Sequence, residues 1–301
     1  MDGWAVGFRV VGRFPLLLGL VVAGGCTAPM KTPTTKPTGL VRPDDDQVGD
    51  LIRRDPEAYL ESCLDRCRKI DQFTTTFYRQ ELLGLVPTLR PVERIFVKWR
   101  REPLSIKFTL PDETSEYAES VYIEGQNKNQ IKVLPRHGLL GLPPTVGSFP
   151  LQWSITFQKA KNPITDFGPE RMLERALKKV VLAHKYGGPI IQYKGIAKLE
   201  LTGQVVHHIQ IINPPQPEFP HCMVDLYIDT TLQIPAGAHC WAKPGVLDTM
   251  YLYADMNLNP GLTDADFTIT PPSSSQPTKR SPTGTPAATT EPATRPEKTT
   301  S

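Results

Sequence analysis

Cysteine is the residue type in this sequence with the widest chemistry, because a thiol can be acylated, oxidised to a disulfide or bound to a metal ion. The chain holds five cysteines. Cys222 and Cys240 flank a hairpin predicted at Thr230-Thr231. A three-residue loop places these two cysteines opposite each other, where a disulfide can form, whereas a two-residue loop pairs Cys222 with His239 instead.

The same hairpin invites comparison with a zinc site, because each cysteine follows a histidine in His221-Cys222 and His239-Cys240. Adjacent residues of a strand point to opposite faces of the sheet, so two Cys and two His cannot converge on one ion without a bulge. The sequence therefore predicts no metal site at this hairpin.

Cys26 ends a short apolar run near the start of the chain, and Arg9 and Arg13 precede that run. The apolar stretch is shorter than the roughly 20 residues that span a bilayer. A basic flank, a short apolar core and small residues at the cleavage point indicate an export signal that is removed on maturation.

The Gly-Gly-Cys26 ending resembles the lipobox of bacterial lipoproteins, in which the cysteine becomes the acylated N-terminus. Ala23 stands where that motif usually has Leu, so the alternative is an ordinary secretory signal cut near Ala23 or Ala28. We expect lipidation of Cys26, and stable anchoring needs more than one acyl chain. Thr27 in place of Asp favours the outer membrane over the inner one, with the protein facing the periplasm.

Composition divides the 301 residues into four parts. We expect a lipoprotein signal peptide (1–25), a Pro- and Thr-rich tether (26–47), a single domain (48–270) and a disordered tail (271–301). The tail lacks any large apolar side chain, so it cannot offset the entropy of ordering. Asp44-Asp45-Asp46 in the tether is expected to be a solvated charge run. A net charge of +3, without a basic stripe, predicts no nucleic-acid partner.

Two amphipathic helices are predicted in the domain. Asp55 is a good N-cap and Pro56 suits the first helical position, and a second helix follows Pro169. The apolar stripe of the first helix comprises Leu60, Cys63, Leu64, Cys67 and Ile70. Cysteines one helical turn apart rarely reach disulfide geometry, so Cys63 and Cys67 are expected to pack as small hydrophobic residues.

Most of the remaining domain alternates between apolar and polar residues with a period of two, which predicts antiparallel strands over 93–100, 104–110, 193–201 and 222–228. In the third strand Tyr193, Ala197 and Leu199 are expected on one face. The apolar face of the first two strands comprises Ile95, Val97, Trp99, Leu104, Ile106, Phe108 and Leu110.

Four short motifs lie between Tyr122 and Phe267: YIEGQN (122–127), NPITDFG (162–168), LER (173–175) and GLTDADF (261–267). Together they resemble an exported bacterial family of unknown function, domain of unknown function 1571. The resemblance covers nearly all of the domain. It supplies no catalytic or binding residues that can be assigned to positions of this chain.

The predicted order of elements is more distantly similar to the LolA/LolB-like lipoprotein-carrier superfamily, as is the YIDTTLQIP stretch at 227–235. The resemblance implies an α+β fold in which a curved antiparallel sheet, an incomplete barrel, encloses helices. It also implies an apolar cavity for acyl chains, which we expect the seven apolar residues of 93–100 and 104–110 to line.

No catalytic constellation is present: the sequence lacks a Gly-x-Ser-x-Gly elbow, a phosphate-binding loop and a His-Glu-x-x-His helix. We therefore predict a non-catalytic, lipid-anchored envelope protein, without a cofactor, that binds an acyl chain, lipid or lipoprotein. The alternative is an envelope interaction or sensor protein that contacts a protein partner through the same fold. An apolar cavity favours the first, and a filled core with an exposed apolar patch favours the second.

Overall fold

The computed structural model describes residues 43–138 and 142–269. Cys26, the predicted signal peptide and the predicted tail at 271–301 lie outside these residues. None of the helices in the described ranges has both the length and the apolar character needed to cross a bilayer.

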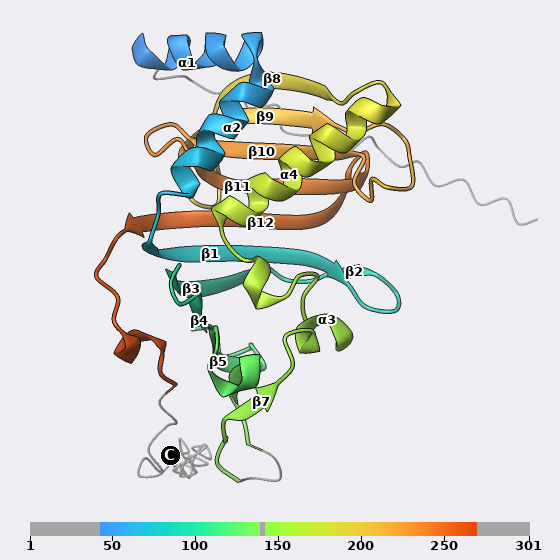
Figure 1. Cartoon of the computed structure of the whole chain (residues 1–301). Helices are drawn as coiled ribbons and strands as arrows, with labels where there is room; N and C mark the ends of the chain where they lie inside the picture. Colours follow the sequence, from blue (N-terminus) through green and yellow to red (C-terminus); the bar gives the residue numbers. More distant parts are fainter. Residues whose placement is uncertain (1–42, 139–141, 270–301) are drawn as a thin grey trace, which may run out of the picture. The chain divides into compact units, whose positions relative to one another are not determined.

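One antiparallel sheet of twelve strands dominates the described residues (Figure 1). β1 lies at its centre, between β3 and β12, and β2 forms a hairpin with the end of β1. The order continues from β3 through β4, β5 and β6 to β7, and from β12 through β11, β10 and β9 to β8. Because β7 and β8 are its edges, the sheet is open.

The strands have the following bounds. They are β1 (Gln72–Leu83), β2 (Thr88–Leu89), β3 (Glu93–Arg100), β4 (Ser105–Thr109), β5 (Tyr117–Ile123), β6 (Ile131–Pro135), β7 (Gly147–Phe149), β8 (Ile190–Lys198), β9 (Val205–Ile212), β10 (Met223–Asp229), β11 (Pro235–Lys243) and β12 (Val246–Leu258). The predicted meander of antiparallel strands is therefore confirmed, and helices cover it as the expected α+β fold requires.

Four α-helices and four short 3-10 turns lie in the described residues, and two of the helices cover one half of the sheet. They are α1 (Pro43–Arg54), α2 (Pro56–Cys67), α3 (Trp153–Thr156) and α4 (Pro169–Ala183), with 3-10 turns η1 (Asn127–Asn129), η3 (Ile164–Asp166), η4 (His184–Tyr186) and η5 (Asp264–Phe267). α2 and α4 pack on each other and lie across the half of the sheet formed by β8–β12 (Figure 1).

Both predicted helices form where the sequence places them. The side chain of Asp55 accepts a hydrogen bond from the backbone N–H of Ala58 at 3.0 Å, and Pro56 is the first helical residue of α2. α4 begins at Pro169. The sequence did not predict α1, which starts at Pro43 inside the segment assigned to the tether and includes the acidic run. α1 contacts the edge strand β8, where the guanidinium of Arg53 lies 5.1 Å from the ring centre of Tyr193.

The main core lies between the helices and the sheet, and a smaller apolar cluster lies on the opposite face, where Tyr227 alternates with Leu226 and Ile228. Tyr193 joins the main core, but Ala197 and Leu199 join the smaller cluster. The prediction that these three residues share a face is therefore wrong. A register shift between Tyr193 and Gly195 inverts the alternation of β8.

The hairpin between β10 and β11 does not bring Cys222 and Cys240 into opposition. Cys240 pairs with Val224, and the loop runs from Asp229 to Ile234, longer than either loop considered from the sequence. The Asp229 carboxylate accepts hydrogen bonds from two backbone N–H groups of this loop, both at 2.8 Å. In this register the two cysteines are not opposed, and both are free thiols in the structure.

Candidate functional site

A cavity of about 330 Å³ lies between the central strands and the segment that connects β7 to α4. Its floor comes from β1, β3, β4, β5, β6 and β12, and its cover is formed by α3 and residues 158–167. The volume is within the roughly 300–1,000 Å³ that is typical of small-molecule sites.

The cavity changes from apolar to charged along its floor, and strand β1 shows this change most clearly. Phe77, Arg79, Glu81 and Leu83 all line the cavity from β1, two residues apart, because alternate residues of a strand share a face. Ile95 lies opposite Phe77 on β3, and Phe108, Ile131 and Val133 add apolar surface from β4 and β6, whereas Arg79 and its opposite residue Glu93 carry charge further along β1 and β3. The site therefore matches a molecule with one apolar and one polar end.

Glu81 lies at the polar end, and only 3% of its surface is exposed. One carboxylate oxygen accepts a hydrogen bond from the Tyr251 hydroxyl, and the other accepts one from the backbone N–H of Lys161 at 3.2 Å. Asn162 in turn donates its amide N–H to the Tyr251 oxygen at 3.0 Å. Burial, reinforced by the negative charge of Glu81, raises the pKa of Tyr251 well above its ordinary value, so the phenol keeps its proton.

Two further ion pairs line the cavity. Arg79 binds Glu93 at 2.6 Å, and Lys159 binds Glu116 at 2.7 Å. Burial lowers the pKa of Arg79, but the charges of Glu93 and Glu81 outweigh it, so the pKa lies above its usual value. The first pair joins β1 to β3, and the second joins the covering segment to the residues before β5, because Lys159 follows α3 and Glu116 precedes β5.

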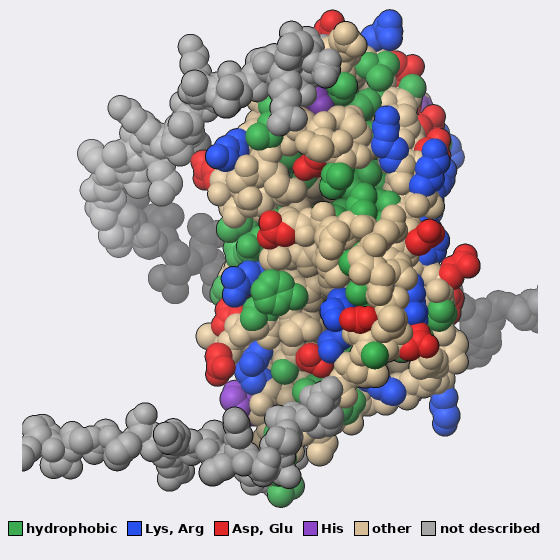
Figure 2. Space-filling view, turned by 90° about the vertical axis from the view of Figure 1, so that its left-hand side faces the viewer, with side chains coloured by type: hydrophobic (Ala, Val, Ile, Leu, Met, Phe, Trp, Pro, Cys, Tyr) green, Lys and Arg blue, Asp and Glu red, His purple; other side chains and the backbone are tan. Residues whose placement is uncertain are grey.

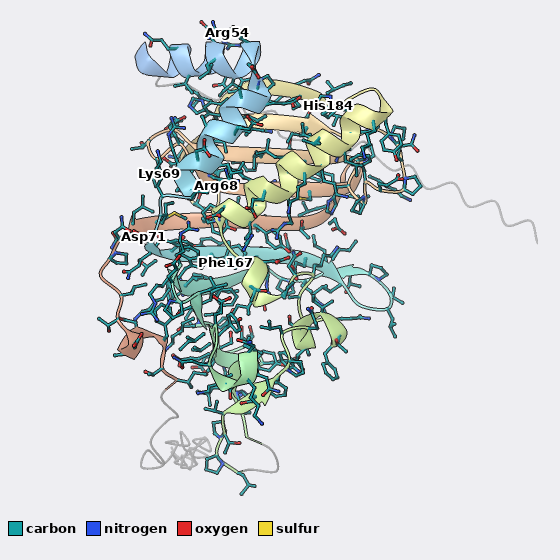
Figure 3. All side chains as sticks on the ribbon, viewed as in Figure 1. Arg54, Arg68, Lys69, Asp71, Phe167 and His184 are labelled. Carbon is teal, nitrogen blue, oxygen red and sulfur yellow. The ribbon has the colours of Figure 1, made fainter. Side chains whose placement is uncertain are left out.

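A second cavity of about 190 Å³ lies near the start of α4, and Phe167 lines both cavities. The Phe167 ring packs between Phe73, Phe77, Phe108 and Tyr253, with ring centres 5.0–6.2 Å away. Figure 3 shows Phe167 beside the beginning of α4, in front of the central strands. The next residue, Gly168, has a φ of +116°, a conformation that other residues rarely adopt, and it turns the chain into α4.

The seven apolar residues predicted to line a cavity share the covered face of β3 and β4 and of the residues next to β4. They differ in whether they line the large cavity, the small cavity or neither. Ile95, Phe108 and Leu110 line the large cavity, and Trp99 and Leu104 line the small one. Val97 and Ile106 line neither cavity and are fully packed in the core. The sequence alone did not identify Glu81, Phe167 or Tyr251 as site residues. The period-two alternation of 77–83 would have placed Glu81 on the same face as Phe77 and Leu83.

Exposed apolar side chains lie close in the chain to residues that line the large cavity, in two separate segments. Leu85 and Val86, at the tip of the β1–β2 hairpin, are 94% and 79% exposed, and the stem of this hairpin lines the cavity. Phe157, directly after α3, is also exposed. Elsewhere, the face drawn in Figure 2 carries acidic and basic side chains interspersed rather than a field of one sign.

The histidines near the two cysteines take part in separate hydrogen bonds. His221 binds Asp248 at 2.8 Å, whereas His239 contacts the Tyr227 hydroxyl at 3.2 Å. Within residues 43–138 and 142–269 there is no group of three or more His, Cys, Asp and Glu side chains arranged to hold a metal ion.

Several solved structures resemble this fold at low sequence identity. The MucA/MucB complex of Pseudomonas aeruginosa matches with a TM-score of 0.42 and 11% identity over 72% of this chain and 61% of that one. The lipoprotein LppX of Mycobacterium tuberculosis matches with a TM-score of 0.39 and 12% identity, over 69% and 98%. A LolA superfamily protein from Nitrosomonas europaea matches with a TM-score of 0.25 and 11% identity, over 71% and 97%.

A search of curated protein sequences found no match. The family model for a protein of unknown function, DUF1571, matches residues 70–275. This range begins just before β1 and extends past η5, so it contains every strand of the sheet, all residues that line the large cavity and all but Cys67 of those that line the small one. The resemblance seen in the short motifs is thereby confirmed, and the chain belongs to the DUF1571 family.

Proposed function

We propose that this protein is a non-catalytic, lipid-anchored envelope protein that holds an acyl chain of a lipid or lipoprotein in its large cavity. The observation that carries the proposal is the change along one cavity from Phe77 and Phe108 to Arg79 and Glu81. An acyl chain gains about 0.8 kcal/mol for each CH₂ group that leaves water, and the charged end leaves room for a polar head group at the mouth.

Lipidation of Cys26 would place this cavity near a membrane. The tether between Cys26 and α1 is shorter than its composition suggested, because α1 begins at Pro43. We propose that the anchor lies in the outer membrane and that the domain faces the periplasm, as Thr27 favours.

Two variants on the same strand and face test this function. Phe108 lines the cavity, whereas Ile106, two residues earlier, is fully buried in the core. Ile106→Ala should cost about 2–5 kcal/mol of stability and leave the affinity for an uncharged fluorescent probe, the dye Nile red, nearly unchanged. Phe108→Ala should cost less than the roughly 3–5 kcal/mol of a packed phenylalanine, because one side of its ring faces the cavity, and should weaken probe binding.

Denaturant unfolding and probe titration of the full chain measure both effects, and native mass spectrometry of the purified wild type should reveal co-purified lipid. The function is contradicted if the wild type neither binds the probe nor carries lipid. A full core-sized stability loss in Phe108→Ala would support the same conclusion.

A second function, contact with a protein partner, has one observation in its favour. Leu85 and Val86 form an apolar hairpin tip that nothing in the described residues covers, and such surfaces mark interaction sites. In that case the cavity would be incidental, and Leu85→Asp would abolish partner binding while probe binding stays intact.

A further inference from the structure

Glu81 is a buried carboxylate that lines a cavity without a cation of its own. Among the ion pairs of residues 43–138 and 142–269, none includes Glu81, and its two hydrogen-bond donors, the Tyr251 hydroxyl and the backbone N–H of Lys161, are neutral. The charge of Glu81 contributes to the raised pKa of Arg79, but the guanidinium of Arg79 donates its hydrogen bonds to Glu93, at 2.6 and 2.7 Å.

None of the other charged residues of the cavity forms an ion pair with Glu81. Four cationic and five anionic side chains line it: Arg79, Arg90, Lys159 and Arg175 against Glu81, Glu93, Asp112, Glu116 and Asp166. Arg79, Lys159 and Arg175 are paired with Glu93, Glu116 and Asp166, and the fourth cation, Arg90, is exposed to solvent. A buried carboxylate without a cationic partner is costly, and a charged hydrogen-bond donor recovers much of that cost.

Three separate elements hold Glu81 in place. It extends from β1, Tyr251 comes from β12, and Lys161 belongs to the segment that covers the cavity. Each carboxylate oxygen uses one hydrogen bond for this support and keeps a further lone pair. The carboxylate is therefore fixed in position before any ligand arrives, and its remaining capacity is for accepting hydrogen bonds.

We propose that Glu81 is the polar anchor of the large cavity and selects amphiphiles whose head group is a protonated amine. This inference rests on the proposed function, because it names the chemistry of the head group for the same site. An ammonium group at the polar end supplies the missing positive charge, and its alkyl chain lies against Phe77, Ile95 and Phe108. A fatty-acid carboxylate would instead bring a second negative charge to Glu81.

The test compares three single-chain ligands that differ only at the head: dodecylamine, dodecanol and dodecanoate. The protein is the full chain carrying Cys26→Ser, and each ligand displaces the uncharged dye Nile red at neutral pH. We expect dodecylamine to bind at least about tenfold more tightly than dodecanol, as a hydrogen bond to a charged group implies, and dodecanoate to bind more weakly than both.

Glu81→Gln should remove this order, bringing dodecylamine close to dodecanol and strengthening dodecanoate. The matched control is Glu116→Gln, which alters an exposed carboxylate of the same cavity and should preserve the order. If wild type binds the three ligands equally, or if Glu81→Gln keeps the preference, the assignment of Glu81 is overturned while the proposed function stands. If none of the ligands displaces the dye, both fail. If Glu81→Gln does not fold, the order of the three ligand affinities in the wild type alone tests the assignment of Glu81.

Discussion

The rings of Phe167 and Phe108 meet edge to face, with their centres 5.1 Å apart and their planes at 74°. Phe108 belongs to the floor of the large cavity, and Phe167 belongs to its cover. Phe167 also lines the small cavity, and among the described residues it is the one that lines both cavities. We therefore expect this aromatic side chain to limit the length of the large cavity.

Removal of the Phe167 ring should connect the two cavities. Phe167→Ala should cost about 3–5 kcal/mol of stability and should increase the affinity for an octadecyl ligand relative to a dodecyl one. Dye displacement with ligands of both lengths measures the ratio. Phe219→Ala, at another buried phenylalanine that lines neither cavity, is the control that should lose stability without changing the ratio. An unchanged ratio in Phe167→Ala would show that the ring does not limit ligand length.

The apolar hairpin tip should matter for exchange with membranes rather than for stability. Leu85→Asp alters a side chain that is 94% exposed, so the melting temperature should stay within about a degree or two. The rate at which the protein takes a fluorescent lipid from vesicles should fall. Val181→Asp, at an exposed apolar residue of α4, should leave that rate unchanged. Equal effects of the two variants would contradict a role for the hairpin.

The segment after β12 should loosen in acid. Hydrogen bonds from Lys98 and from the backbone N–H of Thr263 lower the pKa of Asp266 from 3.8 to about 2. A carboxyl with a lowered pKa stabilises the fold above its unfolded value and loses that contribution as the pH falls through its folded value. Hydrogen exchange of residues 262–269 should therefore accelerate between about pH 4 and pH 2.

Asp266→Asn should show fast exchange already at neutral pH and little further change in acid. Asp264→Asn removes a charge from the same 3-10 turn, but that side chain is 87% exposed, so a smaller effect is expected. Equal exchange rates in wild type and Asp266→Asn at neutral pH would refute the role of Asp266.

Cys26→Ser should release the protein from membranes into the soluble envelope fraction, because it removes the only proposed acylation site. Fractionation followed by mass spectrometry of the mature N-terminus measures this. Cys222→Ser, at a half-buried thiol of the domain, should stay with the membrane. A mature protein that begins at a residue other than Cys26 would support the ordinary secretory signal instead.

Deletion of residues 271–301 should leave the melting temperature within about a degree or two of wild type. The deleted segment lacks Val, Ile, Leu, Met and aromatic residues, so its removal uncovers no apolar surface. The deletion retains η5, whose Phe267 is buried. A shift of many degrees in a thermal melt would show that the tail packs on the domain.

The features predicted from the sequence are those that depend on neighbours in the chain. The Asp55 cap and Pro56 start α2 through contacts within one turn, and β3 begins and ends at the predicted residues 93 and 100. The face of the sheet on which Ala197 lies depends on a bulge near Gly195, and a period-two alternation pattern does not predict such a bulge. Glu81 and Tyr251 meet only because β1 pairs with β12, a contact between distant segments that local periodicity does not encode.

The pairing of β1 with β12 also fixes when the fold can be completed. β1 is the first strand to be synthesised and β12 the last, so one edge of β1 stays open until residues 246–258 are available. Such late, long-range pairing slows folding, and an open edge can pair with another chain. A chain that stops before β12 therefore has two half-sheets, ending at β1 and at β11, with no strand to join them, and it should aggregate or be degraded rather than persist as a partly working protein.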